Sequence, residues 1–471
     1  MIPSAAASLT GQAGKVEVST SLVSELRLTA RLGLPLALAE VGWMSTYIVD
    51  ALMVGRMQNS ALAISGSSLG NSIFYAILFF AVGLLLGLDA LVSQAFGNGD
   101  LRDGNRSLAQ SVLIAAAATP VVMGLTLLSP FVLARVGVET AIVQETTAYL
   151  HALVWSAFPL LLYMAVRRYL QAINRTMLIM MSLLTANLVN LAGDWALIYG
   201  HLGFRPLGIA GSGWATVVVR IYMLALLLLG LGLSVRSHGV GFAWRDLLPD
   251  WTRLQTLLRL GWPAGVQSLA ELGASTVMTI FAGRLGATLL AANQVVLDLN
   301  AMAYMVPLGI SAASAVRVGQ AMGRGDAAQV RRATVASAIL SCGWMFLAAI
   351  VFVSVPQHLA RVYTTDPAVV RASIAIFFVC AGAQMFDGLQ VVLSGALRGV
   401  GDTWSPMMAT LKWTWLLAIP VAAFFCFSMH LNLIGLWMGK TAGAVAIAYT
   451  LTAVCLRFRR RLPEPMVSIG D

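Results

Sequence analysis

The sequence predicts an all-α polytopic membrane protein with twelve transmembrane helices in two pseudo-symmetric halves of six helices each. Three observations predict this fold class: an apolar composition, twelve apolar runs of spanning length, and an internal repeat. Of the 471 residues, 59% are hydrophobic and 11% are charged, whereas about 25% of the residues of a typical soluble protein are charged. A soluble chain of this length would need far more charge to cover its surface, so the composition favours a membrane protein.

Other features of the composition exclude several functional classes. The net charge is +10, but the basic residues lie in short segments between apolar runs, which argues against nucleic-acid binding. The four cysteines lie in apolar runs without CxxC or CxxH spacing, so we interpret them as packing residues: Cys342, Cys380, Cys426 and Cys455. The chain has no HExxH motif and no paired-histidine set. We therefore predict no enzyme, no catalytic residue and no cofactor.

Twelve apolar runs are long enough to cross a bilayer, which takes about 20 residues. They cover residues 32–56, 65–90, 107–131, 145–169, 178–200, 208–234, 256–282, 288–314, 329–353, 371–395, 405–427 and 432–456. An even number of spans places both termini on the same side. If the N-terminus is inside, basic residues in inner segments outnumber those in outer segments by about three to one. We therefore expect both termini to be cytoplasmic, in the cytoplasmic (inner) membrane of a bacterium.

An internal repeat relates the two halves of the chain. QAFGNGD (Gln94 to Asp100) matches QAMGRGD (Gln320 to Asp326), and LGLP (Leu32 to Pro35) matches LGWP (Leu260 to Pro263). These and other matches keep a nearly constant offset along the chain. Six spans in each repeat give both halves the same orientation, which is a known transporter architecture with substrate held between the halves. We expect Pro35 and Pro263 to begin corresponding helices, where either could mark a bend.

The repeat and the polar segments predict the division of the chain. We expect a cytoplasmic N-terminal tail at 1–26, an N-lobe of spans 1–6 at 27–234, a cytoplasmic linker at 235–255, a C-lobe of spans 7–12 at 256–458, and a cytoplasmic tail at 459–471. The N-terminal tail lacks the charged region followed by an apolar core that marks a cleaved signal peptide.

Several segments, in this order, resemble the multidrug and toxic compound extrusion (MATE) family. They include Val49-Asp50, SQAFG (Ser93 to Gly97), RYLQ (Arg168 to Gln171), Asn190 with Asp194, the LGWP segment with Glu271, and GALRGVGDT (Gly395 to Thr403). The resemblance covers about residues 27 to 458, and the order and spacing of the segments are specific. It implies two pseudo-symmetric six-helix lobes around a central cleft, and antiport of organic cations against Na+ or H+.

Carboxylates inside predicted spans are the first candidates for function. A charge at bilayer depth costs from about 2.5 to more than 10 kcal/mol, and such residues are usually functional. The sequence has seven of them: Glu40, Asp50, Asp89, Asp194, Glu271, Asp298 and Asp387. The segment DALVSQ, which contains Asp89, resembles a motif of eukaryotic MATE proteins. Asp89 lies near the inner end of its span, where a structural role and a role in transport are both candidates.

In the first half, Asn187, Asn190 and Asp194 lie at i, i+3 and i+7, on one helical face. The resemblance implies a cation or proton site of four residues: Asp50, Asn190, Asp194 and Thr216. Oxygen ligands with two carboxylates suit a hard cation or a proton. The alternative is hydrogen bonding between helices, which Asn and Thr often supply in membranes.

In the second half, Gln267 and Glu271 lie at i and i+4, and Gln384, Asp387 and Gln390 lie at spacings of three. Glu271 and Asp387 match the acidic pair of NorM-like members, which resembles a second coupling site. Those members commonly carry a tyrosine four residues before the aspartate, where this chain has Ala383. The difference makes Na+ coordination at Asp387 less favoured and protonation more attractive.

Further polar, aromatic and methionine residues could line the cleft and bind substrate. The candidates are Glu40, Tyr47, Gln267, Asp298, Gln384 and Met302. Polarizable, adaptable side chains suit varied cationic ligands, although most aromatic residues and methionines of membrane proteins are core or interface residues.

The sequence thus predicts a secondary active multidrug efflux transporter, which exchanges cationic amphiphilic drugs or organic cations for H+ or Na+ by alternating access of two lobes. We expect a monomer in the lipid bilayer, with small-molecule cations as partners and without nucleic acid. Two alternatives are a lipid-linked precursor flippase of the same superfamily and an exporter of a specific metabolite. The predicted acidic cleft argues against anionic cargo, while the choice between H+ and Na+ stays open.

Overall fold

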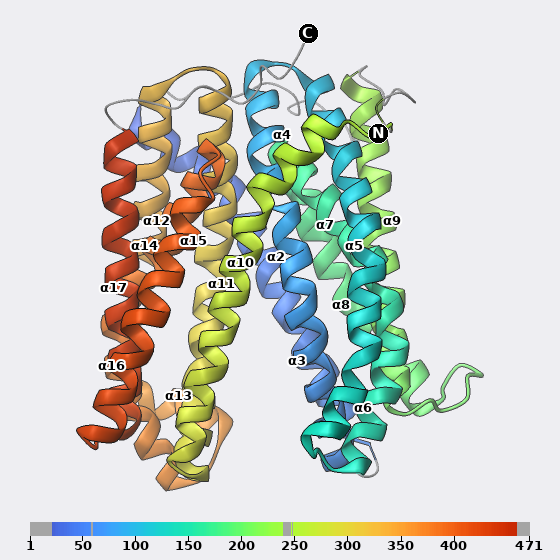
Figure 1. Ribbon diagram of the computed structural model, residues 1–471, viewed down its shortest axis with the longest axis vertical. Helices are drawn as coiled ribbons and strands as arrows, with labels where there is room; N and C mark the ends of the chain where they lie inside the picture. Colours follow the sequence, from blue (N-terminus) through green and yellow to red (C-terminus); the bar gives the residue numbers. More distant parts are fainter. Residues whose placement is uncertain (1–20, 58–59, 239–245, 247, 459–471) are drawn as a thin grey trace, which may run out of the picture. The chain divides into compact units, whose positions relative to one another are not determined.

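Figure 1 shows the computed structural model, which describes residues 21–57, 60–238, 246 and 248–458. The tail predicted at 459–471 lies outside these residues, as do most of the tail predicted at 1–26 and part of the predicted linker. The described elements are helices, and this part of the chain contains no strand.

The first half of the chain forms α2 (Leu22–Val54), α3 (Ser60–Leu85), α4 (Gly87–Asn98), α5 (Leu101–Val136), α6 (Thr140–Leu153), the short 3-10 helix η1 (Val154–Ser156), α7 (Ala157–Ala172), α8 (Thr176–Tyr199) and α9 (Ile209–His238). The second half forms α10 (Trp251–Arg284), α11 (Ala287–Gly323), α12 (Ala327–Ser354), α13 (Pro356–Tyr363), α14 (Pro367–Val400), α15 (Trp404–Thr410), the π-helix η3 (Leu411–Ala418), α16 (Ile419–Ala423), the π-helix η4 (Phe424–Ser428) and α17 (Asn432–Phe458).

These elements confirm the predicted twelve-helix architecture. If α3 and α4, α6 to α7, and α15 to η4 are each taken as one rod, the rods match the twelve predicted spans one to one. Eleven of the rods in the described part of the chain are long and apolar enough to cross a membrane. The remaining one, α10, has 34 residues and carries Arg253, Arg259, Glu271 and Arg284. The short helix α13 was not predicted from the sequence.

The repeated QAxGxGD motif ends one helix and starts the next in both halves. Gly99 and Gly325 have φ values of +83° and +70°, the left-handed conformation that suits glycine at a helix end. Asp100 and Asp326 then cap α5 and α12 by accepting hydrogen bonds from the backbone N–H groups of Asp103 and Gln329. Because these caps start helices in polar sequence, α5 and α12 begin before the apolar spans that the sequence predicted.

The chain packs as two compact units that divide two of the helices. Apart from terminal residues, one unit comprises Val41–Gly265, and the other combines residues up to Glu40 with Val266 onward. The first part of α2 therefore packs in the second unit, and the first part of α10 packs in the first unit. In the second unit α14 packs against α11, α12 and α17 (Figure 1). Pro35 and Pro263 lie inside α2 and α10, so the expectation that they begin helices is wrong.

Close backbone contacts hold the first parts of α2 and α10 at corresponding positions. A Cβ atom on Gly309 of α11 would lie 2.3 Å from the backbone nitrogen of Ala37 in α2. A Cβ atom on Gly83 of α3 would lie 2.3 Å from the Cα atom of Gly265 in α10. The two contacts correspond in the repeat, because Gly309 is the repeat equivalent of Gly83 and Gly265 is the equivalent of Ala37. Glycine at positions 83 and 309 is therefore required by packing.

A charged anchor fastens each of these helix parts. In the second unit, Glu25 of α2 accepts hydrogen bonds from Arg317 Nε (2.7 Å) and Nη2 (2.9 Å), and from Gln329 Nε2 (3.4 Å). Glu25 and Arg317 are 0% and 1% exposed. We call these three residues the second-unit anchor. A buried charge is tolerated when it pairs with an opposite charge through two hydrogen bonds, as Glu25 does with Arg317.

The first unit has a corresponding anchor with the charges reversed. Arg253 of α10 donates to Asp103 Oδ1 (2.5 Å) and to Ser107 Oγ (2.9 Å) of α5. We call these residues the first-unit anchor. Arg253 occupies the position in the second repeat that Glu25 occupies in the first, and Gln329 is likewise the equivalent of Asp103. The repeat thus keeps the position of the charged residue on α2 and α10 but reverses its sign. The charged partner comes from non-equivalent helices, Arg317 of α11 in the second unit and Asp103 of α5 in the first.

Removing the carboxylate of the second-unit anchor should destabilise the protein. The change Glu25→Gln places an amide in front of the buried Arg317 guanidinium in place of the carboxylate, and breaking a buried pair in this way costs about 3–5 kcal/mol. We expect a clearly lower melting temperature for the detergent-solubilised protein. Arg27→Gln, an exposed position two residues along the same helix, is the matched control and should melt like the wild type. Equal melting temperatures for both variants would show that the anchor contributes little.

Candidate functional site

Three of the predicted first-half residues form one cluster, which we call the first acidic site. Asn190 Nδ2 donates hydrogen bonds to Asp50 Oδ1 and to Asp194 Oδ2 (3.1 Å for the latter). Asn190 and Asp194 are one turn apart on α8, and Asp50 comes from the second part of α2. One amide group thus uses both of its N–H donors to bridge two carboxylates that would otherwise repel each other.

Two oxygens of this cluster lack a donor. Asn190 Oδ1 and Asp194 Oδ1 are buried and accept no hydrogen bond from any described residue, and both parent side chains are 0% exposed. Buried acceptors are nearly always satisfied in proteins. A proton on a carboxylate or a small hard cation would satisfy these oxygens, because both prefer oxygen ligands.

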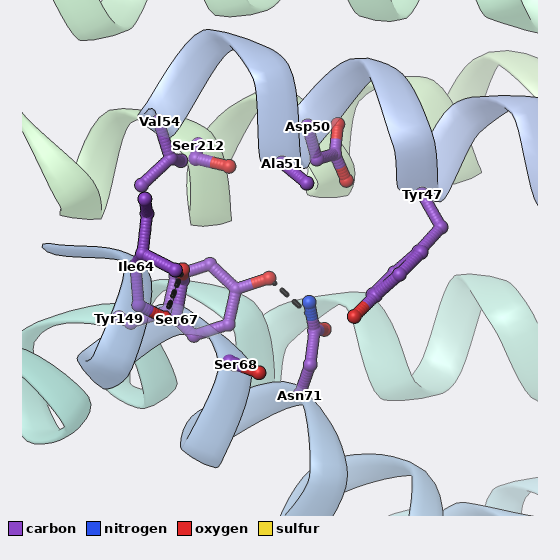
Figure 2. Close-up of a pocket in the computed structure, with 10 residues that line it drawn as sticks. All are labelled: Tyr47, Asp50, Ala51, Val54, Ile64, Ser67, Ser68, Asn71, Tyr149 and Ser212. Carbon is purple, nitrogen blue, oxygen red and sulfur yellow. Dashed lines mark hydrogen bonds between the residues drawn. The ribbon is translucent and has the colours of Figure 1, made fainter. Parts of the chain in front are cut away.

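A small cavity of about 60 Å³ opens beside Asp50 (Figure 2). Its lining comes from α2, α3, α6 and α9, and includes Tyr47, Asn71 and Ser212. Tyr149 completes one wall and donates a hydrogen bond to Asn71 Oδ1 at 3.0 Å, drawn as a dashed line in Figure 2. Because a liquid water takes about 30 Å³, the cavity is large enough for a small ion or a water but not for a drug.

The fourth predicted residue of this site, Thr216, does not bond to the carboxylates. Its hydroxyl donates to the carbonyl of Ser212, one turn earlier on α9, at 3.0 Å. Asn187, on the same face of α8, instead links α8 to α2 by donating to the carbonyl of Gly42 (2.9 Å) and accepting from Thr46 (3.1 Å).

A buried arginine lies one turn beyond Thr216 on α9. Arg220 is 3% exposed and donates to Ser156 Oγ and to Tyr75 OH (3.2 Å). Its guanidinium also lies 5.1 Å from the centre of the Phe74 ring. Arg220 is not among the site residues predicted from the sequence, although a lone arginine in the middle of the run 208–234 is as costly in a membrane as a carboxylate.

The second predicted acidic pair, which we call the second acidic site, lies in the other unit. Gln267 Nε2 donates to Glu271 Oε1 at 3.0 Å on α10, and Gln390 Nε2 donates to Asp387 Oδ1 at 3.2 Å on α14. Asp387 is buried, while Glu271 lies on an exposed face of α10. Gln384 does not join them, because its amide donates to Asn300 Oδ1 at 3.1 Å.

Two basic residues that the sequence analysis did not consider as site residues accompany this pair. Arg398 of α14 interacts electrostatically with Glu271, and Lys440 of α17 interacts electrostatically with Asp387. Arg398 Nη2 is held 3.2 Å from Ser311 Oγ. The ammonium of Lys440 lies 4.4 Å from the centre of the Trp437 ring. The second acidic site therefore has its own positive charges close by.

The other predicted cleft residues are not gathered at either site. Asp298 accepts a hydrogen bond from Gln294 at 2.8 Å on α11, and Met302, one turn further, is exposed. Glu40 is half-buried at the point where α2 passes from one unit to the other. Asp89 is fully buried and paired with Arg168 at 3.4 Å, which favours a structural role for that carboxylate.

Comparison with known proteins gives matches over nearly the whole chain. The MatE family model matches residues 35–196 and 263–424, two windows that begin at the equivalent prolines of the repeat, Pro35 and Pro263. "Probable multidrug resistance protein NorM" of Bradyrhizobium diazoefficiens is 31% identical over 445 residues, covering 93% of this chain and 94% of the relative. The protein of the same name in Xylella fastidiosa is 31% identical over 430 residues, covering 91% of each chain.

Solved structures show the same fold at lower identity. An outward-facing multidrug resistance MATE family transporter superposes with a TM-score of 0.84 at 19% identity, covering 95% of this chain and all of the other. The Vibrio cholerae MATE transporter VcmN gives a TM-score of 0.86 at 17% identity, covering 94% of this chain and 98% of the other. The chain is therefore a multi-pass membrane protein that belongs to the MATE family of transporters, and it is similar to the NorM-like members.

Proposed function

We propose that the protein is a secondary active multidrug efflux transporter, which exchanges cationic amphiphilic drugs for H+ or Na+ by alternating access of its two lobes. The observation that carries this proposal is the first acidic site, where one amide bridges two carboxylates and two buried oxygens lack donors. The names of the NorM relatives, as multidrug resistance proteins, support the drug as cargo.

The first acidic site can exist in two charge states. With Asp50 and Asp194 both ionised, it attracts a cation, because charges interact strongly where water is excluded. A proton turns one carboxylate into a donor, and Asn190 Oδ1 is an acceptor without a donor of its own. A Na+ ion would instead be held by the free oxygens of Asn190 and Asp194. Either ion removes the negative charge that holds a cationic drug, so ion and drug compete.

The second acidic site adds a further place for cationic cargo in this proposal. Glu271 lies on an exposed face of α10 and can meet a ligand, while Asp387 is buried on α14. Ala383 stands where related transporters carry a tyrosine, so we favour protonation over Na+ binding at Asp387. Tyr47, exposed beside the cavity of the first site, can contribute a cation–π contact, and Thr216 remains a candidate ligand.

We further propose that the protein is a monomer in the cytoplasmic (inner) membrane of a bacterium with both termini in the cytoplasm, as the distribution of basic residues predicts. An anionic lipid-linked precursor or an organic acid fits poorly with two acidic sites. A lipid-flipping assay run beside a drug-protection assay separates these alternatives, since a flippase would be active only in the first.

The coupling ion can be identified from ethidium efflux in cells that express the protein. We collapse the Na+ gradient and the proton gradient separately and follow ethidium fluorescence. Efflux should stop when the coupling gradient is collapsed and continue when the other is, because the ion must enter downhill to displace the drug. Efflux that persists with both gradients collapsed would contradict antiport.

Neutralising the acidic residues should impair exchange in everted vesicles. For Asp50→Asn and Asp194→Asn we expect ion-driven drug exchange to fall roughly 30-fold, since loss of a buried, hydrogen-bonded charge costs about 2 kcal/mol or more. Glu271→Gln and Asp387→Asn should weaken drug binding. The matched control is Glu139→Gln, an exposed carboxylate at the N-cap of α6 whose side chain makes no capping hydrogen bond. Normal exchange in all four variants would refute the proposal.

A further inference from the structure

An apolar groove of about 700 Å³ runs between α12 and α14 of the second unit. Small residues from both helices leave this space open, and a Cβ atom added to Gly382 of α14 would meet nothing within 4 Å. Large side chains flank the groove, and they are Phe346, Ile350 and Val353 from α12 and Phe378, Met385 and Phe386 from α14. The remaining lining residues are Cys342, Ala349, Ser354, Ala381 and Leu389, so the lining carries no charged residue.

Contacts on the buried side of the two helices fix the shape of the groove. Ser341 Oγ donates a hydrogen bond to the carbonyl oxygen of Gly388 at 2.8 Å. A Cβ atom added to Gly388 would lie 2.7 Å from Met345 Cγ, so the helices are in close contact there. Further along, the buried rings of Phe352 and Phe377 pack edge to face with their centres 5.1 Å apart. The groove is therefore preformed, and a ligand does not have to open it.

The exposed face of these helices has the character of a surface against lipid. Both helices are long and apolar enough to span a membrane. The six large side chains that flank the groove are 38% to 53% exposed. Hydrocarbon accepts such a face, whereas polar or charged side chains would be costly against it. The exposed face of α10 is different, because it carries Glu271, Ser275 and Thr276, as a face towards water does.

The dimensions of the groove suit a single hydrocarbon chain. From Cys342 to Ser354, α12 advances about 18 Å at about 1.5 Å per residue. One leaflet takes about half of a hydrocarbon core that is about 30 Å thick. The groove thus has the length of one acyl chain in one leaflet.

Other occupants fit the groove less well. A helix of a second copy would be about 10–12 Å wide with its side chains, and spanning helices approach closely where small residues meet. Here the small residues lie between phenylalanines, so a slender chain can reach them and a helix cannot. A cationic drug would find no carboxylate among the lining residues.

We propose that the groove between α12 and α14 is a specific binding site for one acyl chain of a membrane lipid. The proposal requires only that the protein spans the membrane, so it does not depend on the antiport function. A chain in the groove gains dispersion contacts with walls that are already in place, which lipids on a smooth face of the protein do not. Asp387 lies on the buried side of α14 beside Gly388, so the bound chain borders the helix that carries part of the second acidic site.

The test is photolabelling of the full-length protein in phosphatidylcholine nanodiscs that contain a rising fraction of a phospholipid with a diazirine in its acyl chain. Labelled peptides are quantified by mass spectrometry. Labelling of the groove residues should saturate at a low fraction of the probe, because the site holds one chain. Labelling of Leu128 and Val132, which are exposed on α5, should rise in proportion to the probe and gives the reference for ordinary lipid contact.

Two substitutions from opposite helices fill the groove. Gly382→Leu adds a side chain in open space, and Ala349→Leu adds one from α12. Each should abolish the saturable part of the labelling and leave only the proportional part. The matched control is Gly343→Leu, an exposed position of α12 that does not line the groove and where an added Cβ atom also meets nothing within 4 Å. It should label like the wild type, and leucine in place of glycine favours the helix in both glycine variants.

Each outcome decides the proposal. Groove labelling that rises in proportion to the probe, as on α5, overturns it, as does saturable labelling that survives both Gly382→Leu and Ala349→Leu. Disulfide cross-linking of two copies through the half-exposed Cys342, without labelling of the groove, would instead assign the surface to a second copy. Displacement of the labelled chain by ethidium would assign it to the cargo. If Gly382→Leu does not fold, as judged by size-exclusion chromatography, the saturation of the wild type and the response of Ala349→Leu still decide.

Discussion

The charged anchors are the interactions on which the rest of the structure depends. Glu25 with Arg317, and Arg253 with Asp103, hold the first parts of α2 and α10 in units to which the remainder of those helices does not belong. Each of the two helices is therefore fastened in one unit and carries its carboxylate, Asp50 or Glu271, in the other. Pro35 and Pro263, which cannot donate a backbone hydrogen bond, lie between the anchor and the carboxylate in both. A buried ion pair at the fixed end keeps that end in place, because separating it would leave a charge without a partner.

Much of the fold could be predicted from the sequence, but the exchange of helix parts could not. Apolar length predicted the twelve spans, and the repeat predicted their division into halves. Hydrophobic patterns do not identify the helix against which a face packs. The sequence therefore predicted that α2 and α10 each pack entirely within their own half. The anchors were also hidden. Glu25 and Arg253 occupy equivalent positions of the repeat but carry opposite charges. That both belong to anchors becomes clear only in the structure, where Asp103 contacts Arg253 and its repeat equivalent Gln329 contacts Glu25.

Contacts in the candidate site could be predicted where both residues lie on one helix. They could not be predicted where a side chain has several possible hydrogen-bond partners. The spacing on α8 placed Asn190 beside Asp194, and Gln267 beside Glu271 follows from the same rule on α10. Thr216 shows the limit, because a hydroxyl inside a helix can bond to a carbonyl of its own preceding turn and needs no partner elsewhere. Gln384 likewise bonds to Asn300 and not to Asp387. Arg220 was missed for another reason: basic residues were used only to orient the spans, not to describe the charge inside them.

The balance of charge makes the two acidic sites unequal. The first has two carboxylates and, on α9, one guanidinium held by neutral partners, so it is negatively charged whenever both carboxylates are ionised. In the second, Arg398 acts on Glu271 and Lys440 acts on Asp387, so two positive charges already oppose two negative ones. A cation gains less electrostatic energy at a site that is already balanced. The repeat points the same way: Met278 stands at the position of the second repeat that corresponds to Asp50, so the helix position does not itself require a carboxylate. On this reasoning we propose that the ion that drives exchange binds in the first unit, while the exposed Glu271 of the second attracts the cationic cargo.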